Sequence, residues 1–279
     1  MTDEGCGSCG ACTGAVTVTA PGSRFTRPLS PHVNTGSCGG AGSEAYLTFT
    51  LGTASDVFIT THGTGIDTVL YVRECSCTGM EVACNDDADG LTTSMLRLNA
   101  LAPGNYNLFV DTKAAMSADV DVDLYITAPG AASDRCGNPT FIAAGTTAIS
   151  GNTCTFNHDQ AAFGDMVDCT FTGGGAGEDR IYYFYVPTTR TVTFDGCNSA
   201  TNYDTTIYVR NVCTNTSGPA QVACNDDGCG GMPDACDGGY RSSVTQTLSP
   251  GLYHFFADGY FETAWPCPCG DYQYDLIGI

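Results

Sequence analysis

The chain has 279 residues, of which 30 are acidic and 10 are basic, so its formal net charge is −20. A surface without a basic footprint excludes nucleic acid and anionic membranes as favoured partners. No apolar run reaches the roughly 18 residues of a transmembrane helix, so we expect no membrane span.

The 17 cysteines are the most unusual feature of the composition. So many cysteines, with 35 glycines and only 14% charged residues, are typical of a disulfide-bonded, exported protein. Binding of zinc or an iron–sulfur cluster is the rival use of the thiols. We expect a secreted or cell-surface protein, and because no signal peptide is visible in the first twenty residues, we expect it to have been removed.

Residues 1–14 form a cysteine-rich tail with the spacing Cys6-x-x-Cys9-x-x-Cys12. This spacing is similar to one arm of an iron–sulfur binding run, but no Cys-Pro ligand follows it. Disulfide bonding, or a linker role, is therefore favoured over metal binding for the tail.

Strands are predicted in chain order by alternation of apolar and polar residues, with Pro-Gly turns between them. In the first half they are residues 15–19, 47–51, 57–60, 66–73, 95–98, 106–111 and 120–126. In the second half they are residues 182–186, 191–194, 203–210, 253–258 and 275–276. No long stretch has a convincing helical period, so the chain is predicted to be all-β.

One segment of the chain occurs twice. Ile66-Asp-Thr-Val-Leu-Tyr-Val-Arg73, followed by Cys84-Asn-Asp-Asp87, returns as Tyr203-Asp-Thr-Thr-Ile-Tyr-Val-Arg210, followed by Cys224-Asn-Asp-Asp227. Self-similarity over this distance indicates two copies of one module. After the tail we expect module one at 15–130 and module two at 131–279, each a jelly-roll-type antiparallel β-sandwich stapled by disulfides.

The two copies of the central strand indicate which of its faces is buried. Leu70 is replaced by Ile207, whereas Val69 is replaced by Thr206. An exchange that keeps an apolar side chain marks the core face, so Leu70 is predicted to face the core and Val69 the outside.

Asp119, Asp121 and Asp123 alternate with apolar residues along one predicted strand. Like charges about 7 Å apart are tolerated in solvent or beside a cation. We expect a charged face or edge strand that discourages sheet-to-sheet pairing, and a metal site is the alternative.

The duplicated pattern resembles the bacterial pre-peptidase C-terminal domains. The resemblance rests on the Asp-Thr-x-x-Tyr-Val strand, the Cys-Asn-Asp-Asp segment and Pro-Gly-x-Tyr-x-x-x-x-Asp, all present in both halves. It is strongest with the cysteine-rich relatives found in secreted proteins of myxobacteria. The resemblance implies a jelly-roll sandwich, export, no catalytic activity of the module itself, and in some members binding of polymers or calcium.

Calcium is the one cofactor for which the acidic loops are candidate sites. Asn85, Asp87 and Asp89, followed by Gly90, place side-chain oxygens at alternate positions, as in the first half of a calcium loop. The alternative is an Asx-type turn whose carboxylates bind their own backbone. The full set of predicted metal ligands is Asn85, Asp87, Asp89, Asp111, Asn225, Asp227 and Asp258.

The disulfide pairing predicted from the repeat closes loops near the central strand. It joins Cys213 to Cys224, Cys84 to Cys75 or Cys77, and Cys229 to Cys236. Further connectivity is not readable from a sequence. The odd number of cysteines leaves one thiol over, which an intermolecular bridge would use.

No histidine or serine motif of an enzyme is present, so we expect a non-enzyme. Phe261 and Trp265 are candidate ligand-binding residues, because exposed aromatic rings stack on sugars, although a core position is the favoured alternative for the aromatic residues of module two.

These observations predict a non-catalytic extracellular or cell-surface protein with a structural or adhesive role, possessing acidic loops suited to calcium. Its expected partners are other surface proteins, itself or a polysaccharide. One alternative is a polymer-binding accessory region of a secreted hydrolase or protease, which the Trp265 loop would serve. Another is a subunit of an extracellular filament, joined by chain-to-chain contacts.

Overall fold

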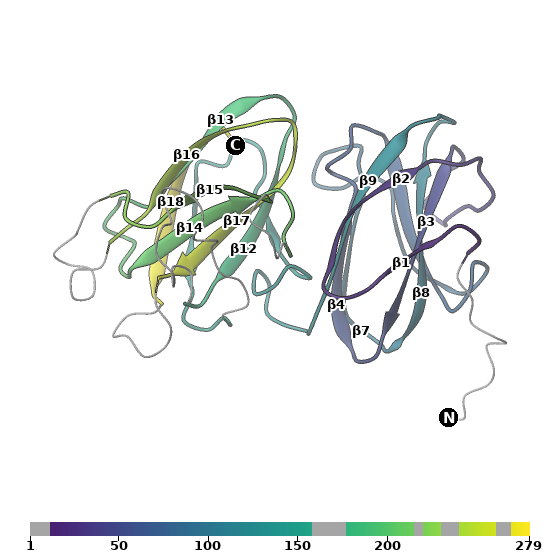
Figure 1. Cartoon of the computed structure of the whole chain (residues 1–279), viewed down its shortest axis with the longest axis horizontal. Helices are drawn as coiled ribbons and strands as arrows, with labels where there is room; N and C mark the ends of the chain where they lie inside the picture. The colour runs from purple at the N-terminus through teal and green to yellow at the C-terminus, as the bar shows by residue number, and fades with distance from the viewer. Residues whose placement is uncertain (1–11, 158–176, 215–219, 230–239, 261–268) are drawn as a thin grey trace. The chain divides into compact units, whose positions relative to one another are not determined.

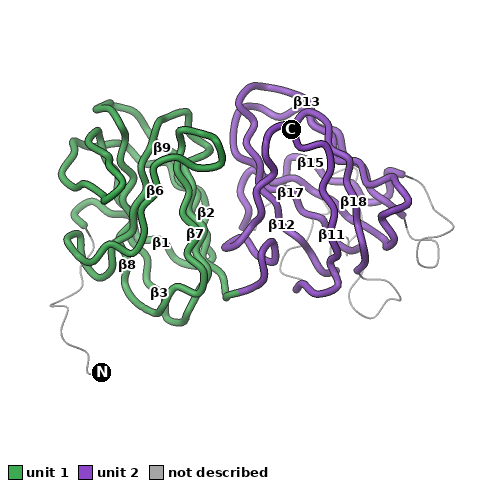
Figure 2. Tube along the Cα trace, turned by 180° about the vertical axis from the view of Figure 1, so that it is seen from behind, with its two compact units in different colours: residues 1–129 green, residues 130–279 purple. Residues whose placement is uncertain are grey.

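The computed structural model describes residues 12–157, 177–214, 220–229, 240–260 and 269–279. These residues form 18 β-strands and no α-helix, which confirms the predicted all-β class (Figure 1). The chain divides into two compact units, Met1–Pro129 and Gly130–Ile279, so the division lies one residue before the expected one (Figure 2). Within the described part of the chain, no helix has the length and apolarity needed to cross a membrane.

Unit 1 consists of two sheets that pack face to face. Its strands are β1 (Val16–Val18), β2 (Gly22–Pro28), β3 (Glu44–Leu51), β4 (Ser55–Thr60), β5 (Thr68–Glu74), β6 (Glu81–Asn85), β7 (Met95–Leu101), β8 (Gly104–Thr112) and β9 (Asp119–Thr127). One sheet has the order β1-β3-β8-β5-β6 and the other has the order β2-β9-β4-β7.

Unit 2 repeats this arrangement. Its strands are β10 (Thr140–Phe141), β11 (Ala148–Asn152), β12 (Arg180–Val186), β13 (Arg190–Asp195), β14 (Thr205–Arg210), β15 (Gln221–Asn225), β16 (Ser243–Leu248), β17 (Gly251–Gly259) and β18 (Asp271–Ile277). The sheet orders are β10-β12-β17-β14-β15 and β11-β18-β13-β16.

Eight strands of each unit follow the order of a jelly roll with Greek-key connections: consecutive strands alternate between the two sheets except at the hairpins β5–β6 and β14–β15. The paired strands run antiparallel except at one edge, where β1 pairs with β3, and β10 with β12, in parallel. The predicted jelly-roll sandwich is therefore confirmed, with an added parallel edge strand in each unit.

The core of each unit lies between its two sheets. In unit 1, Leu70 and Val72 point into a cluster of apolar side chains from both sheets, as predicted from the repeat. In unit 2 the core is more aromatic, and the rings of Phe194 and Phe255 stack with their centroids 4.0 Å apart.

The outer face of the larger sheet in unit 1 is also buried, which the sequence did not predict. Val69, Tyr71 and Phe109 are fully buried in a second apolar cluster on this face. The connection between β2 and β3, residues 29–43, covers the cluster: a side chain at Gly36 would lie 2.6 Å from the Tyr71 ring. We call residues 29–43 the cover loop.

Of the predicted charged face or edge at Asp119, Asp121 and Asp123, the edge was wrong, and along the face only Asp119 is exposed while Asp121 is half-buried. The strand β9 lies inside its sheet, between β2 and β4, and Asp123 is fully buried. Its carboxylate accepts hydrogen bonds from Arg24 Nε at 3.0 Å and from the Tyr125 hydroxyl at 2.6 Å. Burial raises the pKa of Asp123, and Arg24 opposes that rise, so a cation on the neighbouring strand β2 makes the buried carboxylate tolerable.

Five disulfide bonds join described cysteines, and they connect segments far apart in the sequence. The bonds are Cys12–Cys77, Cys38–Cys84, Cys136–Cys213, Cys154–Cys269 and Cys197–Cys229. Cys75 and Cys224 are also disulfide-bonded.

The predicted local pairings of Cys84, Cys213 and Cys229 were therefore wrong. The prediction placed each bond across the loop next to its own strand. Cys84 instead faces the cover loop and bonds Cys38, because the outer side of β6 lies under that loop. Cys213 and Cys229 bond the distant Cys136 and Cys197, while Cys236, the partner predicted for Cys229, lies outside the described residues.

Candidate cation sites

Each unit holds three aspartates at the same end of its larger sheet. They are Asp67, Asp86 and Asp87 in unit 1, and Asp204, Asp226 and Asp227 in unit 2. In each group, one oxygen per carboxylate lies within 4.8 Å of the others. We call the groups the first and second acidic triads. In both units the first aspartate precedes the central strand, and the other two follow its hairpin partner.

A serine fixes the backbone of each triad. The Ser94 hydroxyl lies within hydrogen-bond distance of the Thr68 and Asp86 carbonyl oxygens, and the Ser94 N–H donates to the Thr68 hydroxyl at 3.1 Å. Ser242 makes the same contacts with Thr205 and Asp226. Sequence reasoning missed these serines, although both stand just before or at the strand that follows the Cys-Asn-Asp-Asp segment.

The two asparagines of the predicted calcium loops are engaged with the backbone. Asn85 Oδ1 accepts a hydrogen bond from the Met95 N–H at 3.0 Å, and its Nδ2 donates to the Asp87 carbonyl at 3.2 Å. Asn225 Oδ1 accepts from the N–H groups of Gly228 and Ser243, at 2.8 and 3.0 Å. Both side chains thus hold the acidic loop in shape, as in the Asx-turn alternative.

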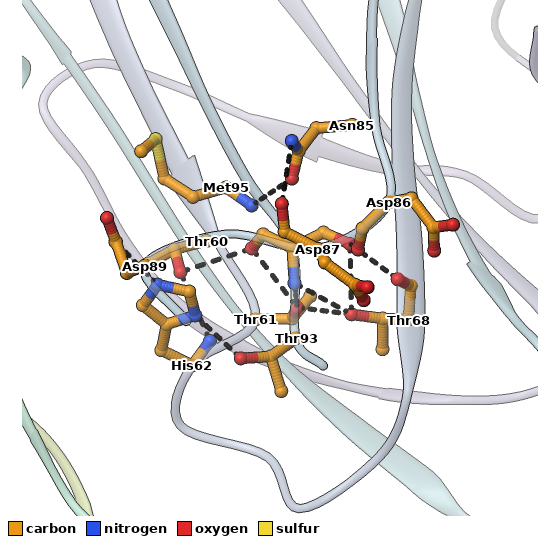
Figure 3. A network of polar contacts seen from close by, with 11 residues as sticks. Thr60, Thr61, His62, Thr68, Asn85, Asp86, Asp87, Asp89, Thr93 and Met95 are labelled. Atoms are coloured by element: carbon orange, nitrogen blue, oxygen red, sulfur yellow. Dashed lines mark hydrogen bonds and ion pairs between the residues drawn. The ribbon is translucent and has the colours of Figure 1, made fainter. Parts of the chain in front are cut away.

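Asp89 is turned toward a histidine. Asp89 Oδ2 lies 2.9 Å from His62 Nε2, and His62 Nδ1 lies 2.7 Å from the Thr93 hydroxyl (Figure 3). His62 is fully buried at the end of β4, so these contacts tie the loop to the smaller sheet. The structure therefore groups Asp87 with Asp67 and Asp86, whereas Asn85 binds backbone groups and Asp89 contacts His62.

The two triads differ in one residue. In unit 1, Lys113 forms an ion pair with Asp86, which raises the pKa of the lysine. The backbone N–H of Lys113 donates to the Asp67 carbonyl at 3.2 Å. In the same way, the backbone N–H of Tyr260 donates to the Asp204 carbonyl at 3.0 Å. Tyr260 therefore takes the place of Lys113 in unit 2. Lys113 is the single lysine of the chain.

The second acidic triad is an unfavourable place for negative charge. Burial raises the pKa of Asp226 to about 7, and the neighbouring Asp227 and Asp204 add to the rise, while a hydrogen bond from Thr206 opposes it. Burial also raises the pKa of Asp204 to about 6. Among the described residues, none of these three aspartates forms an ion pair. Protons relieve this repulsion, and a divalent cation bound by the three carboxylates would do the same.

The remaining predicted ligands lie elsewhere. Asp111 and Asp258 do not join the triads. Both lie on the outer face of the larger sheet of their unit, where they are fully buried. Asp258 Oδ2 accepts a hydrogen bond from the Tyr208 hydroxyl at 2.9 Å. Phe261 and Trp265 lie outside the described residues.

No protein-family model matches this chain, and no curated protein matches it. Among solved structures, it is similar to the CUB1-EGF-CUB2 region of human MASP-1/3, with 8% identity over 91% of this chain and 98% of that one, at a TM-score of 0.21. A protein from Eubacterium rectale is 11% identical over 84% of this chain and 68% of its own, with a TM-score of 0.24. The pre-peptidase C-terminal domain of a collagenase from Bacillus anthracis is 18% identical over 42% of this chain and 95% of that domain, with a TM-score of 0.27. One structural neighbour is thus a domain of the type that the sequence motifs resemble.

Proposed function

We propose that this chain is a non-catalytic extracellular module with a structural or adhesive role, and that its second unit binds calcium at the second acidic triad. Other surface proteins are its proposed partners. The observation that supports calcium best is the contrast between the triads: the one in unit 1 contains a lysine, and the one in unit 2 contains a tyrosine at the same place.

The contrast is explained by charge. Three carboxylates that share a small space repel one another, and a cation removes the repulsion. Lys113 supplies a positive charge within unit 1. The second triad has no described arginine, lysine or histidine in an ion pair with it, so its neutralising charge comes from solution or from protons.

The ligand chemistry of the triad favours calcium over other common cations. Carboxylate oxygens suit hard ions, and calcium accepts six to eight oxygens at about 2.3–2.6 Å. Magnesium demands a near-ideal octahedral shell and keeps several of its waters, whereas calcium accepts irregular sets of carboxylate oxygens. One oxygen from each of Asp204, Asp226 and Asp227 lies within 4.8 Å of the others, so the three carboxylates can share one ion.

The disulfide bonds favour an extracellular location. Five bonds connect described segments separated by 32 to 115 residues, which is typical of proteins that fold in an oxidising compartment. Calcium is abundant outside cells, where modules bind it with dissociation constants of about 0.1–1 mM. We therefore expect weak calcium binding that stabilises the fold and plays no part in catalysis.

Asp226→Asn is expected to abolish calcium binding by the second triad, because it removes one of three charged ligands. The chain stripped of metal with a chelator is titrated with calcium in a calorimeter, and melting is followed with and without the ion. The unchanged chain should bind one calcium and melt higher when it is bound. Asp86→Asn, the matched change in unit 1, should leave binding intact. A melting midpoint that calcium does not move, or equal binding by Asp226→Asn, would contradict the proposal.

Lys113→Tyr is expected to create a second calcium site. It gives unit 1 the residue that unit 2 carries and removes the ion pair with Asp86. The stoichiometry should rise from one calcium to two in the same titration, with a further rise of the melting midpoint. Lys113→Arg, which keeps the charge, is the control and should stay at one. If Lys113→Tyr also binds a single ion, the lysine is not what keeps calcium out of unit 1.

A further inference from the structure

Three side chains with metal-binding atoms meet beneath the cover loop of unit 1. They are His32 from the loop, Glu44 from the start of β3 and Asp111 from the end of β8. One ligand atom from each lies within 4.8 Å of the other two. This cluster is separate from both acidic triads, and its argument does not depend on the calcium proposal.

The Asp111 carboxylate is the most unusual member of the cluster. Its side chain is fully buried, and neither of its oxygens has a hydrogen-bond partner among the described residues. Asp111 pairs with Glu44 across β3 and β8, so two acidic side chains lie side by side. Gly40 closes the site from the loop, since a side chain there would lie 2.5 Å from Asp111 Oδ2. A buried carboxylate in this state is stabilised by a positive partner or by a proton.

His32 is oriented as a metal ligand would be. Its Nε2 lies 3.0 Å from the Thr35 hydroxyl, while its Nδ1 is buried without a hydrogen-bond partner among the described residues. A histidine that binds metal through one ring nitrogen usually donates its other N–H to a neighbouring group, which fixes the tautomer. In the tautomer whose Nε2–H donates to Thr35, Nδ1 keeps a lone pair for a metal.

Glu44 is held in place from two sides. Its Oε2 accepts a hydrogen bond from the Asn34 N–H at 3.0 Å, and its Oε1 accepts one from the Tyr46 hydroxyl. Asn34 and Tyr46 also line a cavity of about 650 Å³. The two residues that fix the Glu44 carboxylate therefore stand between it and this cavity.

Unit 2 holds a related pair of acidic residues. Asp258 ends β17 as Asp111 ends β8, and Asp179 stands just before β12, near the position of Glu44. There the Tyr208 hydroxyl donates to Asp258 Oδ2 at 2.9 Å. The other oxygen of Asp258 has no hydrogen-bond partner among the described residues. Tyr71 holds the place of Tyr208 in unit 1 and acts on Asp111. What unit 1 adds is a histidine close to the aspartate.

We propose that His32 Nδ1, Glu44 and Asp111 bind a zinc ion or a similar divalent transition metal, which fastens the cover loop to the sheet. One imidazole and two carboxylates form a donor set that suits zinc, whereas calcium takes oxygen ligands. Zinc binds these groups at about 2.0–2.2 Å, so the three ligands close around the ion by a small movement of the loop. Water would complete the four-coordinate shell.

The test uses the whole chain, freed of metal with a chelating resin and dialysed against zinc in the presence of millimolar calcium, which occupies the second acidic triad. Bound zinc is measured by mass spectrometry, and cobalt is used as a visible probe of four-coordinate geometry. We expect one zinc per chain, a higher melting midpoint and the absorption of tetrahedral cobalt. His32→Gln should weaken zinc binding by at least 100-fold, and Thr35→Ala, which frees the ring to turn, by about 10-fold.

Two controls keep the result interpretable. Asp226→Asn should bind zinc as the unchanged chain does, because its site is in the other unit. His32→Gln and Thr35→Ala should melt near the unchanged chain when all are metal-free, and if one does not, the other carries the test. The proposal would be overturned if the unchanged chain failed to bind zinc. It would also be overturned if both variants bound zinc as tightly as the unchanged chain, because the ion would then occupy an adventitious site elsewhere.

Discussion

Arg24→Ala is expected to lower the free energy of unfolding of unit 1 by about 3–5 kcal/mol, because it leaves a buried carboxylate without its cation. Asp123 is fully buried, and Arg24 Nε lies 3.0 Å from its Oδ2. The Tyr125 hydroxyl would remain as a hydrogen-bond donor, but it carries no charge. Hydrogen exchange under increasing urea, read on peptides of β4 and β9, measures the loss within unit 1.

The dependence on pH separates this loss from simple loss of packing. Burial already raises the pKa of Asp123 above its value in the unfolded chain, and loss of Arg24 raises it further. The folded variant therefore binds a proton that the unfolded chain has released, and its stability falls as the pH rises. The deficit of Arg24→Ala should shrink in acid, and Arg24→Ala with Asp123→Asn should recover much of the stability. A deficit that is independent of pH would show that the aliphatic part of Arg24 causes it.

Arg27→Ala is the matched control on the same strand. Arg27 lies three residues further along β2, and its guanidinium donates to the Gly14 carbonyl at 3.1 Å in an exposed contact. Its removal should cost less than about 1 kcal/mol, as surface substitutions usually do. Equal losses for Arg24→Ala and Arg27→Ala would argue against a role for the buried charge.

The strands that were predicted from the sequence are those with strong alternation. Leu47, Phe49 and Leu51 face one side of β3, and the repeat gave the same pattern in β12. The strand β2 was missed because Gly22–Pro28 carries a single large apolar residue, Phe25, among polar ones. Its partner β9 supplies the apolar side chains of that region. The strand β2 is therefore identified by its pairing with β9 and not by its own composition.

A strand pattern alone could not predict that the outer face of the larger sheet in unit 1 is buried. Alternation assigns Tyr71 to the face opposite Leu70, and it does not say whether another segment covers that face. The cover loop is poor in large apolar residues, and it is fastened by Cys38–Cys84 and by the contact of Gly36 with Tyr71. Disulfide connectivity follows the fold, so it is not readable before the fold is known.

The sequence predicted where the acidic residues gather, but it predicted only some of the residues that form each triad. The repeated Asn-Asp-Asp segment marks the correct end of the sheet in both units. The alternating pattern of a calcium loop selected Asn85 and Asp89, which the structure uses for the backbone and for His62. Asp67 and Asp86 join Asp87 because the ends of neighbouring antiparallel strands meet, a relation between strands that sequence spacing does not express.

Cys38→Ser with Cys84→Ser is expected to lower the free energy of unfolding of unit 1 by roughly 4 kcal/mol, the loop-closure entropy for a bond between residues separated by 46 positions. We expect the loss of stability to appear first as local opening at the cover loop and only then as unfolding of the whole unit. Amides of the cover loop, and those of β5 and β8 beneath it, should exchange faster than the rest of unit 1, since Tyr71 and Phe109 lose the segment that buries them.

Cys154→Ser with Cys269→Ser is the matched change in unit 2, where the bond spans 115 residues. Its expected cost is similar, about 5 kcal/mol by the same entropy argument, and it should leave exchange in unit 1 unchanged because the bond lies within the other compact unit. If loss of Cys38–Cys84 leaves exchange over β5 and β8 unaffected, the cover loop is held by its packing against Tyr71 and by the Glu44 and Arg73 contacts, and not by the disulfide.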